Sequence, residues 1–270
     1  MSKHLEIRSQ FHPIQPSLRA TDEEVIYREI IPSVPLQPFI YCYWQLQSTQ
    51  TLAKPFAYQV VSDACIDIFF DLNNYKDSFV MGFNKSFVTF PIGINFNYVG
   101  IRFLPAMFPL WFDISAANLA NRLDHLHKHL PAFAEYLIAE TEPQDDLNQL
   151  KPSFDFYLEK ILSQSNFDYD ERFFNALHLI LEKKGILGVS TDLVVGLSPR
   201  QLRRIFQHYI GVSAKSFAKV VRFQLILNAK PSMQSLRESK LFYDGYFDQA
   251  HFIKDFKQFY GLTPSQAFKR

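Results

Sequence analysis

The sequence predicts an α+β protein in which an antiparallel β sandwich or barrel-like domain comes first, a helical connector follows, and an all-α domain ends the chain. Short aromatic-rich runs alternate with turn residues up to about residue 112. Apolar residues then recur at three- and four-residue steps, which is the period of a helix. We therefore expect a β-rich domain at 1–112, a connector at 113–166 and a helical domain at 167–270.

Length and composition limit the class of protein before any motif is considered. The chain has 270 residues, of which 47% are hydrophobic, so it can bury a substantial core. Its two cysteines, Cys42 and Cys65, cannot form a disulfide framework. Polar residues interrupt every apolar run well before the roughly 18 residues that a membrane span requires. We expect a soluble, cytoplasmic protein with no membrane partner.

The first domain is predicted to consist of short strands. Between Pro38 and Leu46, alternate residues fall on opposite faces, with Ile40, Cys42 and Trp44 sharing one of them. Similar runs extend from Tyr58 to Val61, Cys65 to Leu72, Phe79 to Phe83, Phe87 to Ile92 and Phe96 to Leu104. Short strands at this spacing favour an antiparallel sandwich or barrel.

The connector is predicted to be helical. Leucines from Leu119 to Leu137 recur at helical steps, with Pro131 either interrupting one helix or starting a second. An amphipathic segment from Phe154 to Leu162 follows, and the polar stretch 163–166 marks the boundary of the last domain.

The last domain is predicted to be entirely helical, and its helix ends are marked by capping residues. Ser198 precedes a proline, Gly211 and Gly261 follow apolar stripes, and Asp248 is placed as an N-cap. The predicted helices run from Glu171 to Lys184, Thr191 to Val195, Pro199 to Tyr209, Ala214 to Ala229, Leu236 to Tyr243 and Gln249 to Tyr260, with a final turn from Pro264.

Charge is distributed unevenly along the chain. Residues 1–165 hold 12 Lys+Arg and 18 Asp+Glu, a net charge of −6, whereas residues 166–270 hold 16 and 9, a net charge of +7. A basic segment of domain size attracts a polyanion such as nucleic acid, although a solvated basic surface is an equally good interpretation of charge alone.

Two similar units within the basic segment favour the nucleic-acid interpretation. From Gly196 to Gly211 the order is a glycine, an N-cap, an apolar stripe, exposed basic residues and a final glycine. The same order recurs from Gly245 to Gly261. Arg and Gln form paired hydrogen bonds with base edges, and an α-helix fits the major groove.

Together these motifs resemble the DNA-reading domain of the AraC/XylS family of transcription regulators, over about residues 168 to 270. The resemblance rests on Leu197-Ser198-Pro199-Arg200-x-Leu202-x-Arg204-x-Phe206, on Gly245-Tyr246-x-Asp248-Gln249-x-His251-Phe252-x-x-x-Phe256-Lys257, and on Gly261-Leu262-Thr263-Pro264-Ser265-Gln266. It implies two helix-turn-helix units joined by a long helix, which looks like Ala214 to Ala229. The segment Thr191 to Val195 is about two residues shorter than the family's first helix, and Lys240, Leu241 and Asp244 depart from its pattern near the second unit.

The resemblance implies specific roles for the exposed side chains. Base contacts are expected from Arg200, Arg203, Arg204, Gln249, His251 and Lys254, with Ala250 and Ile253 on the same surface. Phosphate contacts, which add salt-dependent affinity without reading sequence, are expected from Gln207, Lys215, Lys219 and Lys257.

The amino-terminal part resembles, more loosely, the sensory or dimerisation domain of a subset of such regulators, through Pro38 to Trp44, Ser62 to Ile68 and Val99 to Pro105. An effector pocket among its many aromatic residues is a candidate, with Arg102 as the partner of an anionic effector, although an exposed strand arginine is the commoner case. Candidate partners are double-stranded DNA, a small effector, a second copy of the chain and, for an activator, RNA polymerase.

Other functions find little support in the sequence. The His125-x-His127-x-His129 pattern lacks the accompanying ligands of a metal site, and Asp63, Asp67 and Asp71 are predicted to be solvated. No hydrolase or metalloprotease motif is present, so we expect neither an enzyme nor a cofactor. The alternative is a protein-interaction module with weak or non-specific DNA binding.

Overall fold

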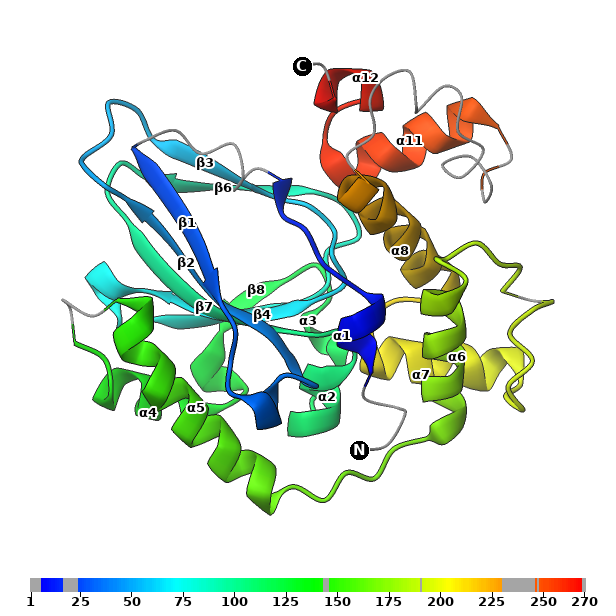
Figure 1. Ribbon diagram of the computed structural model, residues 1–270, viewed down its shortest axis with the longest axis horizontal. Coiled ribbons are helices and arrows are strands. Elements are labelled where there is room, and N and C mark those ends of the chain that lie inside the picture. Colours follow the sequence, from blue (N-terminus) through cyan, green and yellow to red (C-terminus); the bar gives the residue numbers. More distant parts are fainter. Residues whose placement is uncertain are drawn as a thin grey trace.

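A computed structural model describes residues 6–16, 24–142, 146–189, 191–229, 246 and 248–268. The predicted class is confirmed: an antiparallel β-sheet domain is followed by helices (Figure 1). The strands are β1 Val25–Ile30, β2 Ile40–Ser48, β3 Phe56–Val60, β4 Ile66–Asp71, β5 Ser78–Met81, β6 Val88–Gly93, β7 Asn97–Phe103 and β8 Leu123–His125. The α-helices are α1 Ile7–Gln10, α2 Met107–Phe112, α3 Ala116–Leu119, α4 Pro131–Ala139, α5 Leu147–Gln164, α6 Glu171–Glu182, α7 Pro199–Tyr209, α8 Ala214–Ala229, α11 Gln249–Tyr260 and α12 Pro264–Ala267.

The strands form a six-stranded sheet in the order β1-β2-β7-β4-β5-β8 and a two-stranded ribbon of β3 and β6. One face of the sheet packs against the ribbon, where Trp44 and Met81 of the sheet share a core with Tyr58 and Val60 of β3. Helix α5 covers the opposite face, and Phe154 contacts the ring of Tyr43 at a centroid distance of 5.3 Å. Because successive side chains of a strand point to opposite faces, the residues of the sheet contribute to two cores, one on each side.

Two sequence predictions about helices are wrong. Leu123–His125 was expected within a helix, but these residues form β8, which pairs with β5 at the sheet edge. Thr191 to Val195 was expected to be a helix, but its described residues form turns, with Asp192 N bonded to Gly188 O. In the first stretch, pairing with a strand distant in the sequence decides the conformation over apolar periodicity, and in the second, hydrogen-bonded turns do. The helix predicted from Leu236 to Tyr243, with Lys240, Leu241 and Asp244, lies outside the described residues.

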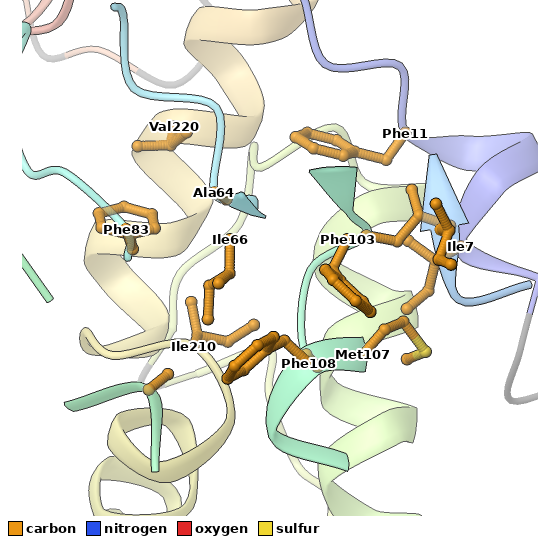
Figure 2. Packing of buried hydrophobic residues seen from close by; sticks show 14 of the residues in the cluster. Ile7, Phe11, Ala64, Ile66, Phe83, Phe103, Met107, Phe108, Ile210 and Val220 are labelled. Carbon is orange, nitrogen blue, oxygen red and sulfur yellow. The ribbon is translucent and has the colours of Figure 1, made fainter. Parts of the chain in front are cut away.

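One hydrophobic core joins the sheet domain to the helices that follow residue 166. Phe83, Phe103 and Phe108 of the first part belong to the same buried cluster as Ile210 and Val220 of the second (Figure 2). At Gly211, where φ is +88°, an added Cβ would lie 2.9 Å from the carbonyl oxygen of Ala116. The carboxy-terminal helices are therefore packed on the sheet domain in this structure. The boundaries proposed at residues 112 and 166 remain predictions.

Polar contacts reinforce this packing. Gln224 of α8 is 2% exposed, accepts a hydrogen bond from Ile14 N at 2.8 Å, and donates to Ser62 O at 2.8 Å and to Ile14 O at 3.3 Å. At the far end of the helical domain, Phe87 N donates to Gln258 O at 3.1 Å. No helix in the described parts of the chain is long and apolar enough to cross a membrane.

Candidate nucleic-acid interface

Helix α7 is defined by strong local capping. Ser198 accepts a hydrogen bond from Gln201 N, Gln201 Oε1 accepts one from Ser198 N at 2.9 Å, and Pro199 occupies the first helical position. This reciprocal capping satisfies backbone donors that the first turn otherwise leaves without partners. Leu202 and Phe206 are buried, which turns the opposite side of the helix toward solvent.

The exposed side of α7 carries the residues predicted to contact DNA. Arg200, Arg203, Arg204 and Gln207 are all exposed. Within the described part of the chain, none of the three arginines is held by an ion pair. Arg203 lines a groove toward α8, whereas Arg204 lies on the other side of the helix, in a crevice shared with Asp170 and Tyr209. The two arginines therefore point to different sides of α7.

Helix α11 presents the second predicted surface. Asp248 caps it by accepting a hydrogen bond from His251 N at 2.7 Å, and Gly261 ends it with φ +91°. Phe252 and Phe256 are buried on its inner face. The residues of α11 predicted to lie on the DNA-facing surface are exposed or half-buried. Gln249, Ala250, Lys254 and Lys257 are exposed, and His251 and Ile253 are half-buried.

Lys219, one of the predicted phosphate contacts, pairs with a buried carboxylate. Its Nζ lies 3.0 Å from both carboxylate oxygens of Asp255, whose residue is 3% exposed. His251 Nε2 lies 3.5 Å from the same carboxylate. Lys219 therefore ties α8 to α11, and Asp255 is a site residue that the sequence reasoning missed. The signal for it was an acidic residue within the apolar stripe of α11, one turn after His251.

A groove of about 830 Å³ brings several predicted residues together. Arg203 of α7, Lys215 and Lys219 of α8, and His251 of α11 all line it. Arg222 lines it too, and its guanidinium lies 4.7 Å from the ring centre of Tyr246. Burial raises the pKa of Tyr246 to about 12, against the lowering effect of Arg222, so the phenol stays neutral. Residues of both predicted reading helices thus line one groove, in which basic side chains lie among mainly apolar and small residues.

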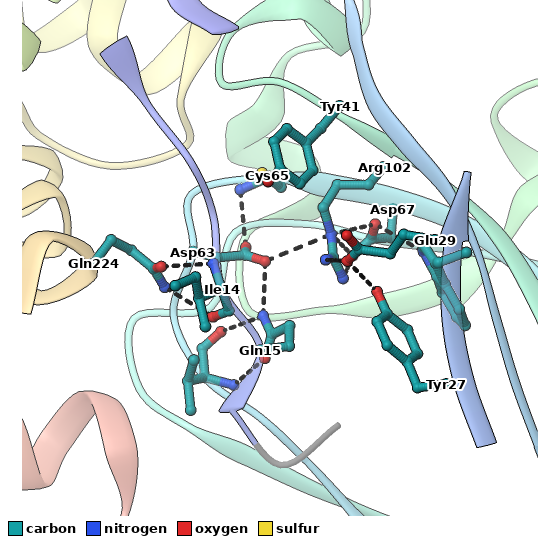
Figure 3. Close-up of polar contacts among 12 residues, drawn as sticks. Ile14, Gln15, Tyr27, Glu29, Tyr41, Asp63, Cys65, Asp67, Arg102 and Gln224 are labelled. Carbon is teal, nitrogen blue, oxygen red and sulfur yellow. Dashed lines mark hydrogen bonds and ion pairs between the residues drawn. The ribbon is translucent and has the colours of Figure 1, made fainter. Parts of the chain in front are cut away.

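Arg102, the predicted effector partner, is buried and faces carboxylates (Figure 3). The expectation of an exposed strand arginine is wrong, because Arg102 is 1% exposed. The prediction that Asp63 and Asp67 are solvated is wrong too, because they are 7% and 3% exposed. Arg102 and Asp67 lie opposite each other on β7 and β4, with Arg102 Nε 3.1 Å from Asp67 Oδ1. Asp63 and Glu29 approach the same guanidinium at 3.7 and 3.8 Å.

The buried charges shift the pKa values of both partners. Burial raises the pKa of Asp67 to about 6, although Arg102 lowers it. Burial alone would lower the pKa of Arg102, but the carboxylates, led by Asp67, raise it well above its usual value. Arg102 therefore stays charged, within a cluster that holds three carboxylates.

A chain of hydrogen bonds links this cluster to the carboxy-terminal helices (Figure 3). Asp63 Oδ2 accepts a bond from Gln15 Nε2 at 2.7 Å, and Gln15 also bonds both backbone groups of Val61. The next residue toward the amino terminus, Ile14, is held by Gln224 of α8. The segment around Ile14 thus contacts the buried charges on one side and the joining helix on the other.

One histidine of the connector, His129, pairs with a nearby carboxylate. His129 Nε2 lies 3.2 Å from Asp124 Oδ2, and Lys128 pairs with the other oxygen of Asp124 at 2.6 Å. The described residues contain no group of three or more potential ligands suited to a metal ion.

Comparison with known families divides the chain in the same order as the fold. Residues 28–123 match a domain of unknown function, DUF6597, and residues 194–270 match a family described as a helix-turn-helix domain. No curated protein matches the chain.

Solved structures of ToxT from Vibrio cholerae are similar over most of the chain. Apo ToxT of a point variant from strain SCE256 is 11% identical with a TM-score of 0.44, covering 92% of this chain and 98% of that one. ToxT bound to (E)-4-(8-methylnaphthalen-1-yl)but-3-enoic acid is 13% identical with a TM-score of 0.40, covering 91% and 97%. ToxT from strain O395 is 15% identical with a TM-score of 0.36, covering 92% and 98%.

Proposed function

We propose that the chain is a DNA-binding transcription regulator and that α7 and α11, within the stretch 194–270 that matches a helix-turn-helix domain, are its two reading helices. The observation that carries this proposal is a pair of capped helices, α7 and α11, whose exposed sides bear basic and amide side chains and which both line one groove. Helices of this diameter enter the major groove.

Base reading is assigned to Arg200, Arg203 and Arg204 of α7 and to Gln249, His251 and Lys254 of α11. The arginines are exposed and unpaired in the described part of the chain, so binding DNA breaks no internal ion pair. Bidentate contact of arginine with guanine is the commonest specific contact in the major groove.

Phosphate contact is assigned to Gln207, Lys215 and Lys257, which are exposed. Lys219 receives a different role, because its ammonium group already pairs with Asp255 at 3.0 Å. It holds α11 against α8 and so sets the spacing of the two reading helices.

The base and phosphate assignments predict different effects of substitution. Arg203→Ala is expected to weaken binding to the preferred site by about 1–3 kcal/mol while leaving non-specific binding nearly unchanged. Lys257→Ala is expected to weaken binding to all sequences similarly. It should also reduce the slope of log affinity against log salt concentration by about one. Fluorescence anisotropy on a selected site and on scrambled DNA, at two salt concentrations, measures both. An Arg203→Ala protein with unchanged discrimination removes the base-reading assignment.

We also propose that a small effector bound in the amino-terminal domain changes DNA affinity. The hydrogen bonds from Asp63 through Gln15 and Ile14 to Gln224 supply a physical connection between the two parts. A homodimer and contact with RNA polymerase follow from the family resemblance alone. Sedimentation of the protein with and without DNA tests the dimer, and transcription in vitro tests the polymerase contact.

A further inference from the structure

The sheet domain contains an apolar pocket of about 200 Å³ between the β3–β6 ribbon and the facing side of the six-stranded sheet. Aromatic side chains form much of its wall, with Trp44, Phe69 and Phe79 from the sheet and Tyr58 and Phe90 from the ribbon. A cavity of about 150 Å³ with an apolar lining is known to hold benzene. This pocket therefore has room for one aromatic ring with a short substituent.

The pocket opens toward solvent at one side. Leu123 of β8 lines it and is 44% exposed, and Pro91 of β6 lines it and is exposed as well. Both belong to edges, one of the sheet and one of the ribbon. A small molecule can therefore enter without unpacking either core.

Among the described residues that line the pocket, Asp67 alone carries a formal charge. Its Oδ1 accepts bonds from Arg102 Nε at 3.1 Å and from Trp44 Nε1 at 3.3 Å. Among the described residues, its Oδ2 accepts only from two Arg102 nitrogens, both at 3.4 Å, which is near the outer limit of a hydrogen bond. This carboxylate therefore retains the capacity to accept a further hydrogen bond.

The surrounding charges decide which kind of ligand fits. Arg102 does not line the pocket, and Asp67, Asp63 and Glu29 all lie within 3.8 Å of its guanidinium. The cluster thus holds three carboxylates against one cation. An anionic ligand beside Asp67 would be repelled, whereas a cation or a neutral N–H donor would be attracted, and aromatic walls also favour a cation.

We propose that this pocket binds a small single-ring compound with an amino group, the ring packing among the aromatic walls and the nitrogen donating to Asp67. The inference rests on the proposed function in that such a compound would be the regulator's effector. It replaces the anionic effector on Arg102 that the sequence suggested. The ring size follows from the pocket volume, and the amino group follows from the charge of its lining.

Three ring compounds of similar size and different charge test the proposal on the full chain. Benzylamine, benzyl alcohol and benzoate are titrated at neutral pH, with Trp44 fluorescence as the readout because this indole lines the pocket. We expect benzylamine to bind at least tenfold more tightly than benzoate. Benzoate binding as tight as benzylamine, or no response to any of the three, overturns the proposal.

Variants locate the binding site. Asp67→Asn is expected to weaken benzylamine at least tenfold and to change benzyl alcohol little, while Asp77→Asn, an exposed acid on the same hairpin, leaves all three unchanged. If circular dichroism shows that Asp67→Asn is unfolded, Leu123→Phe, at the open side of the pocket, is tested instead. It is expected to weaken the binding of both benzylamine and benzyl alcohol. Unchanged affinities in that variant contradict the site.

DNA binding without ligand is measured in parallel by anisotropy. A protein that discriminates between DNA sequences but shows no preference for benzylamine refutes the ligand assignment and leaves the reading helices intact. A protein that binds benzylamine through Asp67 but does not discriminate between DNA sequences refutes the proposed function instead.

Discussion

Replacement of Gln224 by methionine tests how firmly the DNA-binding helices are attached to the sheet domain. The two side chains are similar in length and both suit a helix, so the change removes polar contacts with little change in volume. Gln224 is 2% exposed and makes three hydrogen bonds, with Ile14 N, Ile14 O and Ser62 O. Methionine can replace none of them.

The expected cost follows from the partners left behind. A buried polar group that loses its partner costs about 1–3 kcal/mol. Ile14 retains an unpaired N–H group and Ser62 an unpaired carbonyl, so we expect the free energy of unfolding to fall by roughly 4 kcal/mol. Asn228→Ala, one turn further along α8, serves as the control. Its side-chain amide bonds His12 O and the backbone Gln224 O of the preceding turn, but the residue is exposed, so water can replace these bonds and their loss should cost below about 1 kcal/mol.

Urea unfolding followed by two probes measures the effect. Both tryptophans, Trp44 and Trp111, lie in the first part of the chain, whereas far-ultraviolet circular dichroism reports mainly on the helices. A shared core predicts that the two transitions of the wild-type protein coincide. The reasoning is refuted if Gln224→Met loses less than about 1 kcal/mol, or if the control loses as much.

Three further changes have expected outcomes. Gly100→Ala should destabilise the protein by about 1–3 kcal/mol in urea unfolding, since the new Cβ would lie 2.4 Å from the Trp44 ring; an unchanged midpoint contradicts this packing. Asp255→Ala should destabilise the protein by about 3 kcal/mol, because Lys219 loses its partner, and should weaken DNA binding, because α11 is no longer held against α8. Unchanged DNA affinity would remove the positioning role of the pair. Burial raises the pKa of Asp67 to about 6, so the native state holds its proton more tightly than the unfolded chain, and this group's contribution to stability should fall as pH rises from about 4 to 6. Urea unfolding of the wild type and of Asp67→Asn between pH 4 and 6 measures this contribution. A difference in unfolding free energy between the two proteins that does not change with pH contradicts the raised pKa of Asp67.

Local chemistry explains which parts of the fold could be predicted. The bounds of α7 and α11 agree with the prediction because Ser198, Pro199, Asp248 and Gly261 act within a few residues of themselves. The prediction for Leu123–His125 was wrong because Leu123 fits the helical period of the neighbouring leucines, while the pairing with β5 that makes this segment a strand is not visible in the sequence.

The site was less predictable, since its decisive contacts join distant residues. Asp67 and Arg102 pair across two strands 35 residues apart, and Lys219 and Asp255 pair across two helices 36 residues apart. A sequence pattern identifies neither partner without the register of the sheet or the packing of the helices. The exposed arginines of α7 needed only the apolar stripe that turns them outward.

The most direct test of base reading is fluorescence anisotropy of the full chain on DNA from upstream of its own gene and on scrambled DNA, at two salt concentrations. A sequence reader is expected to prefer the upstream DNA by a hundredfold or more and to keep that preference at the higher salt concentration. Weak and equal binding to both, lost alike as salt rises, would contradict base reading by α7 and α11.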